Sequence, residues 1–196
     1  MASDPEKQNQ ILTAALEVFL RYGFKKATMG DIADKAGMSR PSVYLVFPNK
    51  EDIFRGVISR KVEEFSRDTK EKLGRCTGVR DGIFAVLETW VVEPFELVST
   101  SPESEELLEF GCSFDPDLRK QMLETTEQQL LQAIRSGLET ESGSGEGSGL
   151  SDQTLARLIT VSTAEMKQCV TSPAELRKLI EATVEVYVSY LSGRDA

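Results

Sequence analysis

Ala36-Gly37-Met38-Ser39, followed by Arg40-Pro41-Ser42-Val43-Tyr44, has the pattern of a tight turn that leads into a helix. Gly37 can adopt the positive φ angle that such a turn requires, and Met38 can fill the angle between two helices. Ser39 is a preferred N-cap, and Pro41 falls in the first helical turn, where its missing N–H has no intrahelical partner. The segment therefore predicts a helix-turn-helix unit whose second helix runs from Ser39 to Phe47.

The residues before this turn predict two further helices. In the first, apolar side chains recur with helical spacing over residues 11–22, and Gly23 is expected to end the helix. In the second, Thr28 and Asp31 have the spacing of a capping box. The buried stripe of this short helix is expected to be Met29, Ile32, Ala33 and Ala36.

The rest of the chain also shows helical periodicity and no alternating strand pattern. Asn49 is expected to cap a long helix that reaches about Leu73, and the Gly/Ser-rich run 142–149 is expected to be a flexible loop. We therefore predict an all-α protein of about nine helices, with a helix-turn-helix domain at 1–50 and a second domain at 51–196. The later helices are expected at 83–91, 102–110, 115–138, 155–169 and 173–191.

Composition excludes several classes of protein. The 196 residues contain no histidine, which rules out Ser-His and Cys-His catalytic pairs. The three cysteines, Cys76, Cys112 and Cys169, are far apart, so we expect no metal site and no cofactor. No apolar run approaches the length of about 18 residues that spans a membrane, and no export signal is recognised, so a cytoplasmic protein is expected.

The charge is unevenly distributed. The whole chain carries 23 Lys+Arg and 32 Asp+Glu, a net charge of -9. Residues 1–75 contain 14 basic and 11 acidic residues, a net of +3, whereas residues 76–196 contain 9 and 21, a net of -12. An asymmetry of this kind suggests that the N-terminal third meets a polyanion, although a chance fluctuation would also account for +3.

Residues 11–57 resemble the DNA-binding domain of TetR-family transcriptional regulators. The order and spacing of the motifs match throughout this stretch, whereas the remaining two thirds match only in being acidic and helical. The resemblance rests on Ala14-Ala15, Phe19, Tyr22-Gly23-Phe24, Ala27-Thr28-Met29, Ile32-Ala33, Ala36-Gly37-Met38-Ser39, Val43-Tyr44, Phe47 and Asn49-Lys50-Glu51.

The resemblance implies that the second helix of the unit enters the major groove of double-stranded operator DNA. Arg40 is then the candidate for guanine O6 and N7, and Pro41 and Leu45 for thymine methyl groups. Alternatively, Arg40 reaches only phosphate and Tyr44 is core packing. Lys25 and Lys26 in the preceding loop add long-range attraction to DNA or are merely solvated. The expected DNA-binding residues are Thr28, Ser39, Arg40, Pro41, Ser42, Tyr44, Leu45 and Lys50, of which Thr28, Ser39, Tyr44 and Lys50 are the candidates for phosphate.

The resemblance also implies a second domain that binds a small-molecule effector and forms a homodimer. The family plan places the dimer contact on the helices at 150–170 and 173–191, and the second of these has apolar residues on more than one face. An ordinary core helix is the alternative. The expected pocket residues, each of which could equally be plain core, are Phe65, Phe84, Trp90, Phe95, Phe110, Cys112, Phe114, Met122 and Met166.

These observations favour a repressor that a small apolar or amphipathic ligand releases from a palindromic operator. An alternative is a redox-responsive regulator that uses Cys112 or Cys76, although no basic cluster or CxxC motif supports a lowered thiol pKa. An acid–base enzyme that uses Glu88, Glu93 or Glu109 is a further alternative. It is disfavoured, because accidental carboxylate pairs are expected in so acidic a segment.

Overall fold

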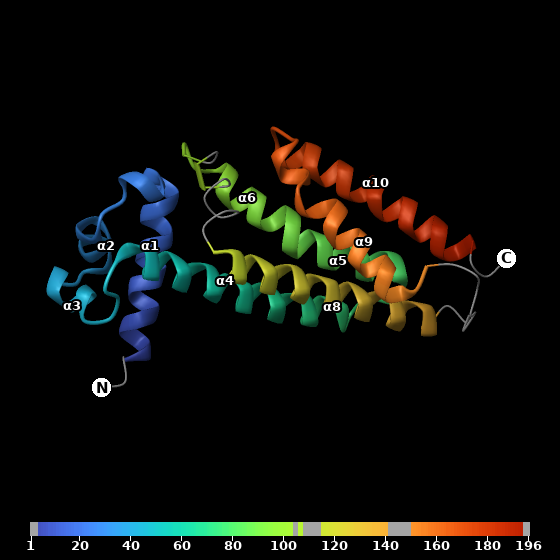
Figure 1. The fold of residues 1–196 in the computed structure, drawn as a ribbon, viewed down its shortest axis with the longest axis horizontal. Helices are drawn as coiled ribbons and strands as arrows, with labels where there is room; N and C mark the ends of the chain where they lie inside the picture. The colour runs from blue at the N-terminus through green and yellow to red at the C-terminus, as the bar shows by residue number, and fades with distance from the viewer. Residues whose placement is uncertain (1–3, 104–105, 108–114, 141–149, 194–196) are drawn as a thin grey trace. The chain divides into compact units, whose positions relative to one another are not determined.

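The computed structural model describes residues 4–103, 106–107, 115–140 and 150–193. Every regular element in these ranges is a helix (Figure 1), as the all-α prediction requires. The expected loop at 142–149 and most of the expected helix at 102–110 lie outside the described residues. None of the described helices has both the length and the apolar character needed to cross a membrane.

The chain divides into two compact units. The first comprises residues 1–63 and 97–118, and the second comprises residues 64–96 and 119–196. Helix α4 (Lys50–Leu73), helix α6 (Glu93–Ser99) and helix α8 (Pro116–Thr140) each contribute residues to both units. The functional boundary placed after residue 50 is not tested by this division and stays a prediction.

The first unit contains α1 (Pro5–Lys26), α2 (Met29–Ala36) and α3 (Arg40–Tyr44) (Figure 1). Helix α1 begins earlier than its apolar spacing predicts, because Asp4 caps it by accepting from the Glu6 N–H at 3.1 Å. Gly23 bends the helix instead of ending it. Its φ of 76° is the only non-helical geometry inside α1, and Phe24 returns to the core.

The core of the first unit forms around the three N-terminal helices and the start of α4. Phe19, Phe24 and Phe54 pack ring against ring, with centroids 5.1–5.6 Å apart. Leu107, from the separate stretch 97–118, joins this core. The fully buried members include Ile11, Ala15, Ile32, Ala33, Val43 and Ile53.

The second unit contains α5 (Val79–Leu87), α9 (Asp152–Ala164) and α10 (Pro173–Ser192), besides its parts of α4, α6 and α8. A π-turn at Glu88–Val92 separates α5 from α6, and a short 3-10 turn at Met166–Gln168 follows α9. The sequence predicts that the helix at 83–91 breaks near Pro94 or soon after, but the helical run continues through the π-helical turn and α6 to Ser99. Glu93 N–H bonds to Glu88 O, five residues back, so Pro94 enters α6 in its first turn, where no N–H is required.

Small residues let α5 and α8 approach closely in the second unit. A β-carbon built on Gly82 would lie 3.1 Å from the Ala133 β-carbon, and one built on Gly137 would lie 2.5 Å from the Val79 backbone nitrogen. Both glycines therefore serve a backbone approach that a larger side chain would prevent. Around this crossing lie the fully buried side chains of Ile83, Leu130, Ile134, Ile159 and Ile180.

Candidate nucleic-acid interface

Helix α2 begins at a complete capping box, as the sequence predicts. The Asp31 N–H donates to Thr28 Oγ1 at 3.2 Å, and the Thr28 N–H donates to Asp31 Oδ2 at 2.9 Å. The Thr28 hydroxyl also donates to Asp31 Oδ2 at 2.6 Å. These bonds, the side-chain bond first, hold the pKa of Asp31 below its usual value. Thr28 is exposed, but its hydroxyl proton is already engaged in the free protein.

The turn between α2 and α3 has the geometry expected of a helix-turn-helix. Gly37 has a φ of 65°, and the Met38 N–H donates to Ala33 O at 2.9 Å, which closes the end of α2. Ser39 caps α3 by accepting from the Ser42 N–H at 3.3 Å. Met38 is partly buried against the core of the first unit. Local capping thus fixes the start of α3.

Helix α3 buries one side and exposes the side predicted to meet DNA. Val43 is fully buried and Phe47, just beyond the helix, is 8% exposed, so both belong to the core of the first unit. On the opposite side Tyr44 is 52% exposed and Leu45 is 87% exposed, and Arg40 and Pro41 are also exposed. Tyr44 and Leu45 together leave apolar surface in water on the side of α3 that is predicted to meet DNA.

Arg40 lies against the first turn of α2 in the free protein. A β-carbon built on Gly30 would stand only 2.7 Å from Arg40 Cζ, so the guanidinium rests on the bare backbone of this glycine. Arg40 also lowers the pKa of Asp31, as a minor contribution after the hydrogen bonds from Thr28. Gly30 was not recognised from the sequence, although a glycine inside a predicted helix is itself a signal of close packing.

The loop lysines and Lys50 are tied to neighbouring groups. Lys26 Nζ lies 2.5 Å from Glu103 Oε1, and this hydrogen bond is the main reason that the pKa of Lys26 is raised. The backbone N–H of Lys25 donates to Glu106 Oε1 at 2.8 Å. Lys50 Nζ donates to three main-chain carbonyls, those of Phe24, Lys25 and Ala27. The predicted phosphate contact of Lys50 therefore competes with bonds already present.

The candidate pocket residues are only partly brought together. Phe65 and Trp90 make an edge-on ring contact with centroids 6.0 Å apart, and Trp90 Nε1 donates to Gln129 Oε1 at 2.7 Å. Phe95 is buried, and Phe84, Met122 and Met166 are partly buried. Phe110, Cys112 and Phe114 lie outside the described residues. The pocket stays a prediction.

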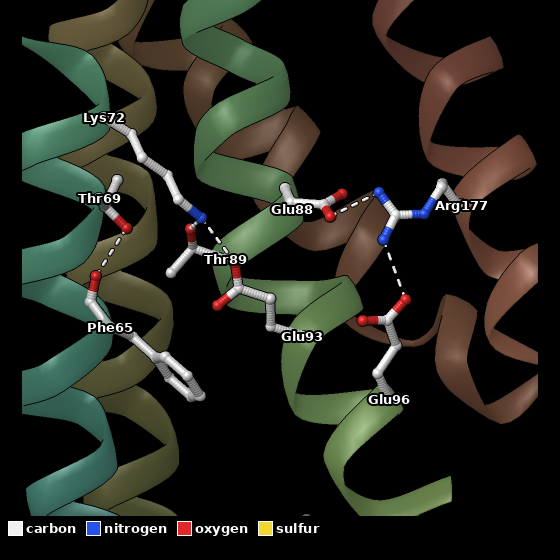
Figure 2. A network of polar contacts seen from close by, with 8 residues as sticks. All are labelled: Phe65, Thr69, Lys72, Glu88, Thr89, Glu93, Glu96 and Arg177. Atoms are coloured by element: carbon white, nitrogen blue, oxygen red, sulfur yellow. Dashed lines mark hydrogen bonds and ion pairs between the residues drawn. The ribbon is translucent and has the colours of Figure 1, made fainter. Parts of the chain in front are cut away.

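The carboxylates considered for acid–base chemistry are engaged in ion pairs within the second unit. Figure 2 shows Arg177 of α10 between Glu88 and Glu96, at 2.5 and 2.9 Å. In the same view Lys72 of α4 reaches Glu93 Oε1 at 2.6 Å and Thr89 Oγ1 at 2.8 Å. Glu109 lies outside the described residues. These ion pairs thus link α4, α6 and α10 to one another around the π-helical segment Glu88–Val92. The spacing of these residues in the sequence could not reveal this network.

The comparisons with known proteins agree with the helix-turn-helix geometry. Residues 11–57 match the family model described as bacterial regulatory proteins, tetR family. The chain is 34% identical over 85 residues to the HTH-type transcriptional activator FasR of Mycolicibacterium smegmatis, a match that covers 43% of this chain and 39% of FasR. It is 37% identical over 70 residues to the fatty acid metabolism regulator protein of Bacillus subtilis, covering 34% and 36% respectively.

Solved structures extend the likeness in fold to nearly the whole chain. A tetR transcription regulator from Haloarcula marismortui superposes with a TM-score of 0.73 at 16% identity, covering 95% of this chain and 98% of that one. The regulator FadR from Bacillus subtilis, solved in complex with stearoyl-CoA, superposes with a TM-score of 0.64 at 20% identity, covering 92% and 97%.

The sequence matches cover a much smaller part of this chain than the structural matches do. The two curated relatives are matched over less than two-fifths of their own length. The structures show the fold of the remainder and no more. The matched family model describes bacterial regulatory proteins, and FasR is named as a transcriptional activator. Residues 11–57 are therefore a helix-turn-helix domain of the kind found in the tetR family of bacterial regulatory proteins.

Proposed function

We propose that the chain is a homodimeric, sequence-specific transcriptional repressor that a small apolar or amphipathic ligand releases from a palindromic operator. The observation that carries the proposal is the exposed side of α3. A helix whose other side is fully buried presents Arg40, Pro41, Tyr44 and Leu45 to solvent next to the cap at Ser39. The N-terminal residues of such a helix contact base edges in the major groove.

The predicted contacts to phosphate position the protein on the DNA. Ser39 and Thr28 are exposed hydroxyl residues at the N-termini of α3 and α2, where free backbone N–H groups favour an anion such as a phosphate. Arg40 supplies a bidentate donor for guanine, and Leu45 a surface for a thymine methyl group. With a net charge of only +3 in residues 1–75, affinity rests on these placed residues and on dimer geometry.

The proposed homodimer uses apolar side chains that α9 and α10 leave exposed in the single chain. Leu158 and Val161 of α9 and Leu179, Val186 and Tyr190 of α10 are all exposed, although each belongs to a helix whose opposite side is core. Exposed apolar side chains on neighbouring helices are typical of an interface. A two-fold dimer presents two copies of α3 about one DNA turn apart, and so reads an inverted repeat.

The effector acts by population shift in this proposal. A ligand that binds more tightly to the conformation with mis-spaced recognition helices lowers operator affinity by its differential affinity for the two states. Among the proteins similar to this chain are a fatty acid metabolism regulator and a FadR regulator solved in complex with stearoyl-CoA, both from Bacillus subtilis. A long-chain acyl-CoA, which is both apolar and charged, is therefore the first ligand class to test.

The redox alternative gains no support from Cys76. Its Sγ donates to Lys72 O at 3.2 Å, and burial is the main reason that the pKa of the Cys76 thiol is raised. Redox-sensing thiols have a lowered pKa, because the thiolate is the reactive form. Cys169 is exposed, and Cys112 lies outside the described residues. If Cys112→Ser abolished an oxidant response of operator binding, the redox mechanism would replace the ligand mechanism.

The experiment that tests the proposed function measures binding to an inverted repeat from the promoter region of the chain's own gene, over a series of salt concentrations. We expect the specific complex to be at least about a thousandfold tighter than the complex with unrelated DNA. We also expect log K to fall linearly with log salt, with a slope of about -0.9 for each phosphate contact. Equal affinity for both DNAs at low salt would refute sequence-specific regulation.

Replacing Arg40 with alanine is expected to weaken operator binding by roughly 1–3 kcal/mol per half-site and to remove the base preference at one position of each half-site. The reason is the loss of a bidentate contact to guanine. Binding should be measured against operators with each base pair substituted in turn. Arg67→Ala, which removes an exposed arginine of the second unit, is the control. An equal loss on every sequence would assign Arg40 to phosphate instead.

Stearoyl-CoA at about 100 times its dissociation constant is expected to stabilise the protein by about 2.7 kcal/mol. For a chain of this size that stabilisation raises the unfolding midpoint by roughly 5–10 °C. Differential scanning fluorimetry measures the shift, and an operator-binding titration measures release. Coenzyme A without the acyl chain is the control. Neither a shift nor release with stearoyl-CoA would remove long-chain acyl-CoA as the effector.

A further inference from the structure

The side chain of Lys50 is directed at the end of another helix. Lys50 is the first residue of α4, yet its Nζ lies 2.7 Å from Phe24 O, 3.1 Å from Lys25 O and 3.0 Å from Ala27 O. These three carbonyls belong to the last turn and the C-cap of α1. Lys50 Nζ also stands 4.6 Å from the centroid of the Phe24 ring. A single ammonium group therefore closes the C-terminal end of α1.

All the hydrogen-bond donors of the Lys50 ammonium group have a partner. An ammonium group has three donors and no acceptor, and here each donor has a carbonyl partner. The last carbonyls of a helix lack intrahelical donors, and they form the negative end of the helix dipole. A cation is unfavourable at the start of α4 but favourable at the end of α1, which accounts for the direction that the side chain takes. No donor is left over for a phosphate.

The turn that Lys50 holds leads directly into the recognition unit. Ala27, the C-cap of α1, is buried, and the next residue, Thr28, caps α2. Helix α2 in turn carries the bare backbone at Gly30 on which Arg40 rests. Lys50 thus connects the start of α4 to the start of α2, and through α2 to the position of Arg40.

We infer that Lys50 is a positioning residue for base recognition and not a phosphate contact. It fixes the α1–α2 turn, and thereby the start of α2 and the arginine that rests on it. This inference rests on the proposed DNA-binding function and replaces the role expected for Lys50 from the sequence. A phosphate contact and a positioning role make different predictions for charge-removing and charge-preserving variants.

Two variants distinguish a positioning role from a phosphate contact. Lys50→Met removes the positive charge, and Lys50→Arg keeps it. Each is measured with the full chain at a temperature where circular dichroism shows it fully folded. The readouts are the ratio of operator to non-specific affinity and the slope of log K against log salt. Lys120→Met is the matched control, because it removes an exposed lysine from the second unit, outside the helix-turn-helix segment.

A positioning role predicts that both variants lower the affinity ratio by roughly tenfold, since the planar guanidinium of arginine does not converge on three carbonyls as an ammonium does. The salt slope of Lys50→Met then equals that of Lys120→Met. If Lys50→Arg instead restores wild-type affinity, and Lys50→Met alone loses about 0.9 in slope per phosphate contact, the inference is overturned.

Amide hydrogen exchange tests the positioning role without DNA. The N–H groups of Asp31 and Ile32 bond to Thr28 at the start of α2. In free Lys50→Arg protein these amides are expected to exchange faster than in the wild type, by roughly tenfold. Unchanged exchange would overturn the inference even if operator binding is confirmed. Failure of the wild-type chain to bind any operator would refute the proposed function and leave this readout intact.

Discussion

Replacing Val186 with aspartate is expected to dissociate the proposed homodimer and to abolish tight operator binding. Val186 is 67% exposed in the single chain, on the side of α10 opposite to the buried residues Ile180 and Val184. In a two-fold dimer both subunits carry the substitution, so the interface contains two copies of it. Burying unpaired carboxylates costs several kcal/mol, so a loss of about 4 kcal/mol, roughly a thousandfold in the dimer dissociation constant, is expected.

Sedimentation velocity at micromolar concentration measures the oligomeric state, and operator binding is measured on the same samples. The monomer retains one recognition helix and is expected to bind a half-site weakly, with no gain from the second half-site. Gln132→Asp is the control, since it adds the same charge at an exposed position of α8. A Val186→Asp protein that stays dimeric would move the interface away from this face of α10.

Gly137→Ala is expected to destabilise the second unit, although alanine is normally the better helix residue by about 1 kcal/mol. The added β-carbon would lie 2.5 Å from the Val79 nitrogen and 2.6 Å from the Val79 α-carbon. Backbone atoms at the start of α5 cannot relieve this clash by a rotamer change, as the end of a side chain could. Helices α5 and α8 must therefore move apart. Overpacking of this kind costs about 1–3 kcal/mol or more beyond the propensity gain.

Thermal unfolding measures this loss, with an expected fall in the midpoint of roughly 5 °C. Gly193→Ala is the control, because no heavy atom lies within 4 Å of a β-carbon built on Gly193. Its midpoint is expected to stay within about 1–2 °C of the wild type. A Gly137→Ala protein as stable as this control would contradict the close crossing of α5 and α8.

Local sequence signals predicted the recognition unit well. The capping box of Thr28 and Asp31, the positive φ of Gly37 and the cap at Ser39 each involve residues within a few positions of one another. Such interactions depend on backbone geometry that the residue types themselves prefer. The exposed and buried sides of α3 followed for the same reason, with Val43 inside and Leu45 outside.

Local sequence signals predicted the structure less well where a residue type fits two structural roles. Tyr22 fits the apolar stripe of α1 by spacing but is 40% exposed, because it lies next to the bend at Gly23. The apolar spacing also does not indicate the start of α1, which is set by the cap Asp4 and a proline at the first helical position, Pro5. A glycine with a positive φ can either end a helix or bend it, and Gly23 bends α1.

Contacts between distant residues could not be predicted from the sequence. The three carbonyls at Lys50 are 23 to 26 positions away in the sequence, and the two partners of Arg177 are 81 and 89 positions away. Leu107 likewise joins the first core from a separate stretch of the chain. Lys50 illustrates the reason. Its position at a helix N-terminus suggests an anion, but tertiary packing brings the end of α1 within its reach.

The central claim is that a two-fold pair of α3 helices reads an inverted repeat. Selection of binding sites by the full chain from a pool of random-sequence DNA tests it most directly. We predict enrichment of an inverted repeat whose half-sites are centred about 10 base pairs, one helical turn, apart, and loss of one base preference per half-site with Arg40→Ala. Enrichment of a sequence without two-fold symmetry, or no enrichment over the starting pool, would contradict the account.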